Sequence, residues 1–143
     1  HKASGNGGQK VNKSSSAVRL IHTPSGVSVS ESGDRSQVRN RSNALKKLRL
    51  RIAMTVRCKI DEDCPVADPF YVPSVHNIHA YAPWLAVLVD HLAFDGWDVR
   101  RTAERYGISS SRLIKIIFRD SGLWQELNRK RAAAGLAPLK GIK

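Results

Sequence analysis

A run of glycines near the start of the chain constrains the fold most, because it suits neither an ordinary helix nor an ordinary strand. Three glycines fall within residues 5–8, and Gln9 with the cations Lys10 and Lys13 comes directly after them. Glycine loses the most conformational freedom on folding, so such a run is tolerated where the backbone needs a positive φ or a close approach to a partner. The run lacks the Gly-Lys-Ser/Thr ending of a phosphate-binding P-loop. We therefore expect a loop that enters a crowded, anionic site.

The charge of the chain is one-sided. Residues 1–58 hold 12 Lys and Arg against two acids, whereas residues 59–143 hold 12 Lys and Arg against 10 acids. The net charge of +12 therefore comes almost entirely from the first part. This bias favours a polyanionic partner, with a merely solvated basic surface as the alternative.

Membrane and secretory features are absent from the sequence. No apolar run has the length of a transmembrane helix, and no signal peptide is visible, so we expect no membrane partner. The two cysteines do not indicate a secreted disulfide scaffold and favour a reducing compartment. The chain begins with His1 and not with Met, which indicates a fragment or a processed product.

The segment after the loop predicts a β-hairpin and then a long helix. Residues 17–23 and 27–30 alternate as strands do, and Pro24 and Gly26 between them indicate a turn. From residue 35 or 36 to about 57 there is no Gly or Pro. The apolar stripe that we expect to pack on the hairpin is Val38, Leu45, Leu48, Ile52 and Val56.

The predicted long helix is strongly basic. It carries eight cations and no acid, namely Arg35, Arg39, Arg41, Lys46, Lys47, Arg49, Arg51 and Arg57. Like charges on neighbouring turns destabilise an isolated helix, so an anionic partner explains them better than solvent does. Phosphates would neutralise them and make binding strongly salt-dependent.

The rest of the chain predicts a connector and a helical module, which makes the whole fold α+β. We place a first domain at residues 1–58, a Pro- and acid-rich connector at 59–75 and the helical module at 76–143. Asp98 is a good N-cap for a helix that stops at Gly107, and Ser109 for one that reaches about residue 120. A last helix spans 123–134. The expected apolar stripe of the module's first helix is Ile78, Tyr81, Leu85, Leu88, Val89 and Leu92.

Residues 103–119 form a helix-turn-helix pattern, with Gly107 at the turn. The second helix, Ser109 to Arg119, offers Ser110, Ser111, Arg112, Lys115 and Arg119 as polar contacts. It is apolar on nearly every side, which is more typical of a buried helix than of one that reads DNA. The near-neutral charge of the module points the same way. We therefore favour packing or docking on a partner over sequence-specific reading of DNA, and expect no specific DNA partner.

An ordered series of motifs links the glycine loop to a known family. The series reads Gly7-Gly8-Gln9-Lys10-Val11-Asn12-Lys13, Ser16-Ala17-Val18-Arg19-Leu20, His22-Thr23-Pro24-Ser25-Gly26-Val27, Arg35-Ser36-Gln37, Asn40 and Ala44. It resembles the catalytic (GGQ) domain of class I peptide chain release factors and of the related ribosome-rescue hydrolases. The resemblance covers about the first 58 residues. In that family a strand precedes the glycine loop, whereas only residues 1–3 do here, so we expect the sheet to lack one edge.

The resemblance implies a ribosome-dependent hydrolysis of peptidyl-tRNA, with the glycine loop in the peptidyl-transferase centre. Gly7, Gly8 and Gln9 are then the catalytic residues, without a metal or a cofactor. The implied partners are the ribosome, through large-subunit rRNA, and peptidyl-tRNA, in the cytoplasm or, in a eukaryote, the mitochondrial matrix. The implied rRNA- and tRNA-binding residues are Lys10, Asn12, Lys13, Arg19, Arg35, Gln37, Arg39, Asn40, Arg41, Lys46, Lys47 and Arg49.

After the catalytic domain the chain departs from the family. No segment is large enough for the codon-reading domain of a release factor, which favours codon-independent rescue. The compact rescue enzymes carry a basic tail, and a helical module stands in its place here. The alternatives are a non-catalytic rRNA-binding protein and a helix-turn-helix nucleic-acid-binding protein.

Several single residues invite weaker interpretations. Cys58, Cys64, His76 and His79 could form a zinc site, but structural zinc sites favour more closely spaced cysteines, so we expect no metal. We expect His91 on a helix surface. The three tryptophans, Trp84, Trp97 and Trp124, are expected to anchor the core or an interface of the helical module.

Overall fold

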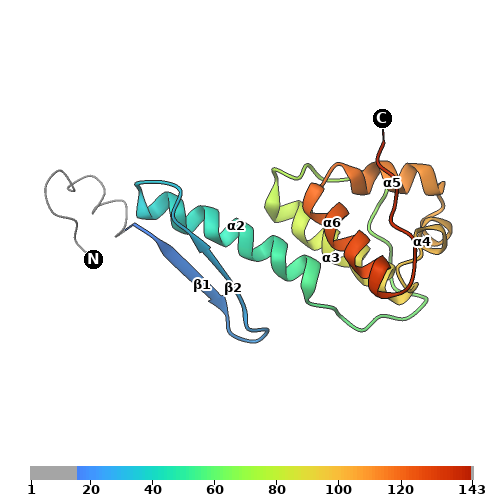
Figure 1. Ribbon diagram of the computed structural model, residues 1–143, viewed down its shortest axis with the longest axis horizontal. Coiled ribbons are helices and arrows are strands. Elements are labelled where there is room, and N and C mark those ends of the chain that lie inside the picture. The colour runs from blue at the N-terminus through green and yellow to red at the C-terminus, as the bar shows by residue number, and fades with distance from the viewer. Residues whose placement is uncertain (1–15, 143) are drawn as a thin grey trace, which may run out of the picture. The chain divides into compact units, whose positions relative to one another are not determined.

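The computed structural model describes residues 16–142 (Figure 1). These residues form an α+β fold, as predicted. The elements are β1 (Val18–His22), β2 (Val27–Glu31), α2 (Gln37–Thr55), α3 (Ile78–Phe94), α4 (Val99–Tyr106), α5 (Ser110–Phe118) and α6 (Ser121–Ala133). The chain divides into two compact units, residues 1–52 and 53–143, which we describe separately.

The first unit contains the predicted hairpin. Strands β1 and β2 pair antiparallel, with Val18 opposite Glu31 and His22 opposite Val27. Gly26 ends the turn with a φ of 74°, a left-handed conformation that favours glycine. Its N–H donates to the His22 carbonyl oxygen at 2.8 Å. The Pro-Gly signal in the sequence therefore marked the turn correctly.

Helix α2 packs against the hairpin through a small apolar core (Figure 1). Val29 of β2 is buried together with Ala44 and Leu48 of α2. Partly buried apolar side chains complete this core, namely Val18, Leu20, Val27 and Ile52. The described part of the unit is thus held by one face of the hairpin and one stripe of the helix.

The predicted stripe of α2 was partly wrong. Val38 is 80% exposed and Leu45 is 42% exposed. The buried face instead runs through Asn40, Ala44 and Leu48 at four-residue spacing. Each residue turns the helix by about 100°, so Leu45 points well away from the line that Ala44 and Leu48 define. The buried face begins with the polar residue Asn40. A search for apolar periodicity does not include polar residues, so it placed the stripe wrongly.

The second unit is helical, and its caps agree with the sequence. Asp98 accepts a hydrogen bond from the Arg100 N–H and caps α4, and Ser109 accepts one from the Arg112 N–H and caps α5. Gly107 ends α4 with a φ of 67°. These three predictions are confirmed.

The last helix begins earlier than predicted, at Ser121. Asp120 accepts a hydrogen bond from the Leu123 N–H and so caps α6. Gly122 lies inside the first turn. A carboxylate at the N-cap stabilises a helix start and therefore outweighs the glycine two residues later.

The core of the second unit is built from all four of its helices. The predicted stripe of α3 is confirmed, because each of its residues is buried. The largest fully buried apolar side chains are Leu85, Leu88, Leu92, Leu113, Ile117, Leu123, Leu127 and Val89. The three tryptophans are half-buried around this core. Trp124, for example, packs edge-on against Phe118 with ring centroids 4.8 Å apart.

The prediction that His91 lies on a helix surface was wrong. Its ring is fully buried, with Nδ1 2.9 Å from the Tyr106 hydroxyl and Nε2 3.3 Å from the Cys64 carbonyl oxygen. The Tyr106 hydroxyl accepts a hydrogen bond from the Ala67 N–H, and burial raises the pKa of Tyr106 to about 12. The connector therefore folds back on α3 and covers His91. The sequence of the connector indicates no regular structure, so this contact could not be predicted.

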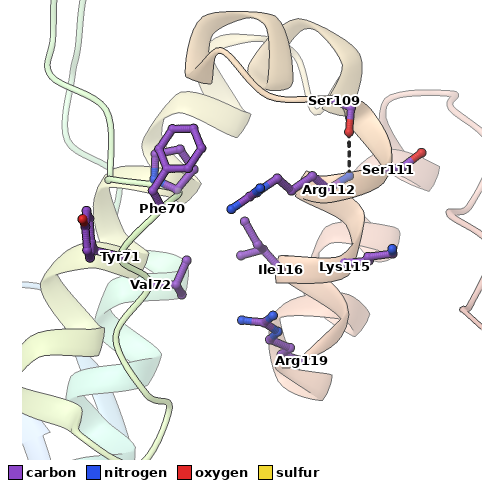
Figure 2. Close-up of a pocket in the computed structure, with 10 residues that line it drawn as sticks. Phe70, Tyr71, Val72, Ser109, Ser111, Arg112, Lys115, Ile116 and Arg119 are labelled. Atoms are coloured by element: carbon purple, nitrogen blue, oxygen red, sulfur yellow. Dashed lines mark hydrogen bonds between the residues drawn. The ribbon is translucent and has the colours of Figure 1, made fainter.

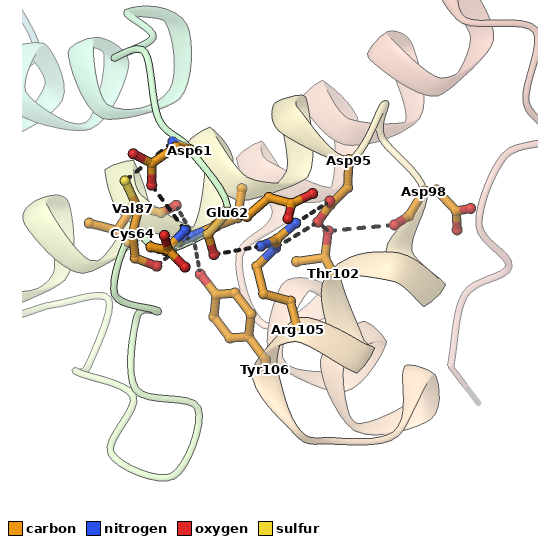
Figure 3. A network of polar contacts seen from close by, with 11 residues as sticks. Asp61, Glu62, Cys64, Val87, Asp95, Asp98, Thr102, Arg105 and Tyr106 are labelled. Atoms are coloured by element: carbon orange, nitrogen blue, oxygen red, sulfur yellow. Dashed lines mark hydrogen bonds and ion pairs between the residues drawn. The ribbon is translucent and has the colours of Figure 1, made fainter.

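An ion pair joins the end of α3 to α4 (Figure 3). The Arg105 guanidinium donates to both oxygens of Asp95, at 2.8 and 3.3 Å, and the Thr102 hydroxyl donates to Asp95 at 2.9 Å. Arg105 also donates to the Glu62 carbonyl oxygen at 3.2 Å. Burial alone would raise the pKa of Asp95, but the hydrogen bonds from Arg105 and Thr102 more than offset burial, so its pKa is lowered.

This lowered pKa predicts that acid destabilises the second unit. The folded-state pKa of Asp95 lies below its unfolded value of about 3.9, so its contribution is present above that pH and is lost as the pH falls through the folded-state pKa. Asp95→Asn should lower the free energy of unfolding by about 3 kcal/mol at neutral pH and flatten its acid dependence. Urea unfolding followed by tryptophan fluorescence measures both effects. The exposed Glu104→Gln variant is the control, and an equal effect in that control would contradict the prediction.

Candidate functional site

The residues expected to perform the chemistry lie outside the described residues. These are Gly7, Gly8 and Gln9, together with Lys10, Asn12 and Lys13. Their roles stay predictions. The structure describes the chain that follows them, beginning at Ser16. We call the hairpin, the segment after it and α2 the frame.

Asn40 anchors that frame from inside α2. Its side chain is 0% exposed, and its amide nitrogen donates to the Ser16 carbonyl oxygen at 2.9 Å and to the Asp34 carbonyl oxygen at 2.8 Å. Its amide oxygen accepts from the Asp34 N–H at 2.9 Å. The Ser16 hydroxyl also donates to the Asp34 carbonyl oxygen, at 2.9 Å. One buried side chain thus joins the beginning of the described chain, the exit of the hairpin and the helix.

The start of α2 shares this anchor. The Asp34 carboxylate accepts from the Ser36 N–H at 2.9 Å, and the Ser36 hydroxyl accepts from the Arg39 N–H at 3.2 Å. The hydrogen bond from the Ser36 N–H, aided by the nearby Arg39 guanidinium, lowers the pKa of Asp34. The backbone of Asp34 is held by Asn40 and its side chain by Ser36, so the first turn of α2 and the anchor form one network.

Asn40 was among the residues expected to contact RNA, and the structure gives it a different position. A side chain that is fully buried and hydrogen-bonded to the backbone is not available to a phosphate. The choice of Asn at this position is therefore explained by folding of the first unit. We remove Asn40 from the expected RNA contacts.

Among residues 16–142, the other expected contacts are carried by β1, by α2 and by the segment between the hairpin and α2, and we refer to them together as the basic face of the first unit. Those that are exposed are Arg19, Arg35, Gln37, Arg39, Arg41, Lys46 and Lys47, and Arg49 is half-buried. Two of them have acidic neighbours: Arg39 lies 3.6 Å from Asp34 and Lys47 lies 3.5 Å from Glu31. Both pairs are solvent-exposed, and such pairs contribute little to stability.

The helix that carries most of this face contains no acid along its length. Within residues 16–142, Arg41 and Lys46 form no ion pair. Repulsion along a helix of this kind is relieved by phosphates. The basic face therefore has the chemistry of a polyanion-binding surface.

The residues weighed for zinc are not brought together. Among residues 16–142 no three His, Cys, Asp or Glu side chains form a group that could hold a metal ion. Cys58 is exposed and Cys64 is half-buried, with its sulfur accepting from the Asp61 N–H at 3.4 Å.

On the second unit, the sequence reasoning missed two aromatic residues. Phe70 and Tyr71 are exposed in the connector, and the Phe70 ring faces the polar side of α5 (Figure 2). The polar contacts expected on α5 are exposed there, except Ser110, which is half-buried. The sequence offered one indication of this surface: two adjacent aromatic residues stand in a Pro-rich connector, where no regular element would bury them.

Comparison with known proteins concerns mainly the first unit. Residues 1–65 match the RF-1 domain family. The chain is 54% identical over 52 residues to peptide chain release factor 1 of Geobacter metallireducens, which is 36% of this chain and 15% of that protein. It is 38% identical over 81 residues to peptide chain release factor 2 of Campylobacter lari, which is 57% of this chain and 22% of that protein.

These matches cover less than a quarter of the length of each relative. The search of solved structures found no match for the chain. Among the helices of residues 16–142, none combines the length and the apolar character needed to cross a membrane.

The Asn40 network predicts a large effect from a small substitution. Asn40→Asp keeps the acceptor for the Asp34 N–H but replaces the donor with an oxygen that faces two carbonyl oxygens. Losing both hydrogen bonds and placing a carboxylate oxygen against these two carbonyl oxygens should lower the free energy of unfolding by about 2–3 kcal/mol. The exposed Arg41→Gln variant should change it by less than about 0.5 kcal/mol. Denaturant titrations followed by far-ultraviolet circular dichroism make the comparison, and similar values for the two variants would contradict the anchor.

Proposed function

We propose that this chain hydrolyses the peptidyl-tRNA ester on the ribosome, because residues 1–65 match the RF-1 domain family and the relatives of this segment are peptide chain release factors. The observation that carries the proposal is the ordered motif series around Gly7-Gly8-Gln9, together with the adjoining frame. That frame is a hairpin, an Asn40 anchor and an acid-free helix.

In the proposed reaction a water molecule attacks the ester carbon that joins the peptide to the terminal ribose. Negative charge develops on the carbonyl oxygen, and the ribose oxygen leaves with a proton. Preorganised donors aimed at developing charge are usually the largest catalytic contribution. We assign this role to the Gln9 backbone N–H, with the Gln9 side chain positioning water and excluding other nucleophiles. Gly7 and Gly8 allow the backbone conformation that aims Gln9.

The protein need not supply a general base in this proposal. The rRNA and the tRNA 2′-hydroxyl provide polar groups around the ester, and the loop sequence holds no acid–base pair. The contribution of the protein is then the placement of one backbone donor and one amide, and the proposal includes no metal or cofactor.

We assign the basic face to large-subunit rRNA and tRNA. The proposed contacts are Lys10, Asn12, Lys13, Arg19, Arg35, Gln37, Arg39, Arg41, Lys46, Lys47 and Arg49. The described members of this set are supported by their exposure, their positive charge and the absence of acids on α2. The proposed place of action is the ribosome, in the cytoplasm or in the mitochondrial matrix.

The finer proposal is ribosome rescue without a stop codon. Its support is that the RF-1 segment leads directly into a helical unit, in which α3, α6 and the helix-turn-helix share one core. Release should then occur from ribosomes with an empty decoding site. Release that strictly requires a stop codon would remove this finer proposal and leave hydrolysis standing.

The proposal predicts that Gln9→Ala and Gly8→Ala abolish release but not ribosome binding. Misplacing one catalytic group can reduce a rate by about 100-fold, and we expect at least that loss in single-turnover release of labelled peptide. Co-sedimentation with ribosomes should be unchanged, because the basic face is intact.

Two results would contradict this prediction. Full release by either variant would show that the loop does not perform the reaction. Ribosome binding by the wild type, with release no faster than from ribosomes alone, would favour the non-catalytic rRNA-binding alternative.

A further inference from the structure

The second unit carries a groove that hydrolysis at the glycine loop does not use. We call it the α5 groove. Its volume is about 790 Å³, and it lies between the connector residues 69–72 and one face of α5 (Figure 2). The residues of interest are Phe70 and Tyr71 on the connector and Ser111, Arg112, Lys115 and Arg119 on the helix.

The connector wall presents aromatic rings to solvent. Phe70 is 60% exposed and Tyr71 is 81% exposed. The segment that holds them is fixed: the Phe70 N–H donates to the Asp68 carboxylate at 2.9 Å, and the Trp84 indole N–H donates to the Asp68 carbonyl oxygen at 2.9 Å. Adjacent exposed aromatic rings on a fixed segment are typical of an interaction surface.

The charged side chains of the helix wall are all positive. Arg112, Lys115 and Arg119 are three and four residues apart, so they share one face of α5, while Leu113 and Ile117 are buried in the core. Across residues 16–142 these three cations form no ion pair, and no acidic side chain lines the groove. The Arg112 guanidinium carbon lies 4.9 Å from the centre of the Phe70 ring, which joins the two walls by a cation–π contact.

A second hollow of about 220 Å³ continues the groove. It shares Val72, Ile116 and Arg119 with the first and adds Tyr81. The two hollows therefore adjoin at Val72, Ile116 and Arg119.

Aromatic rings beside a row of cations match the chemistry of an unpaired nucleic-acid strand. Such a strand offers flat bases for stacking and phosphates for Arg and Lys, and stacking accepts any base. A duplex fits less well. A recognition helix enters the major groove with its amino-terminal residues against the base edges, and here Phe70 covers Arg112 near that end of α5.

We propose that the α5 groove binds single-stranded RNA, with a base stacked on Phe70 and phosphates held by Arg112, Lys115 and Arg119. The choice of RNA over DNA rests on the proposed ribosomal function. The groove then gives the second unit its own RNA contact, separate from the basic face of the first unit.

The test uses the full chain and a single-stranded RNA of about 8 nucleotides, within the site size of such proteins. The RNA carries one 2-aminopurine, whose fluorescence falls when it stacks on an aromatic ring. Phe70→Ala should abolish this quenching and weaken binding about tenfold. Phe70→Tyr should retain both. Because Phe70 is 60% exposed, neither variant disturbs the core.

Charge is tested with two matched triple variants. R112Q/K115Q/R119Q should lower the slope of log affinity against log salt by about 2, because each single-strand phosphate contact contributes about 0.7. R100Q/R129Q/K140Q removes the same charge from other exposed positions of the second unit and should leave the slope unchanged. Fluorescence anisotropy measures both.

Equal losses in the two triple variants would overturn the proposal, because they would show an effect of net charge alone. Unchanged quenching in Phe70→Ala would also overturn it. Tighter binding to single-stranded or duplex DNA than to RNA would overturn the assignment to RNA. No ribosome is present in these titrations, and Gln9→Ala should bind the RNA normally, so their failure is distinct from a failure of peptide release.

Discussion

The hydrogen bonds of Asn40 hold together three parts of the first unit that are distant in sequence. They connect the chain at Ser16, the backbone of Asp34 after the hairpin and the interior of α2. The apolar core of this unit is small: in the described part of the chain, its fully buried members are Val29, Ala44 and Leu48. A small core gives limited stabilisation, so a fully satisfied polar network has a large share in fixing how the hairpin meets the helix. In the proposed function, this frame carries the catalytic loop.

Positive and negative charges are distributed differently in the two units. The first unit concentrates positive charge on α2, where no acid offsets it. The second unit places its acids in structural roles, as Asp95 does with Arg105 and as Asp90 does with Arg57 at 2.8 Å. Burial lowers the pKa of Arg57 although Asp90 opposes this shift. With these carboxylates used inside the unit, the cations of the α5 groove remain available to a polyanion.

Local signals allowed much of the fold to be predicted, and tertiary contacts limited the rest. The alternation of residues 17–30 and the caps at Asp98, Gly107 and Ser109 depend on neighbours in sequence, so the hairpin, the ends of α4 and the start of α5 could be predicted. The positions of Asn40 and His91 depend on segments that fold over them from far along the chain. Exposure of Phe70 and Tyr71 likewise depends on the path of the connector, which no periodicity describes. The basic character of the candidate site could be predicted because the charge of a side chain follows from its type. Whether Asn40 holds the backbone or contacts RNA depends on its burial, which only the structure gives.

The central claim is that this chain delivers a water molecule to the peptidyl-tRNA ester. The most direct measurement is mass spectrometry of peptide released by the wild-type chain from ribosomes with an empty decoding site, in water enriched in oxygen-18. Hydrolysis predicts a free peptide carboxylate with one heavy oxygen, formed faster than on ribosomes alone. Release no faster than on ribosomes alone, or a product without the heavy oxygen, would contradict the account.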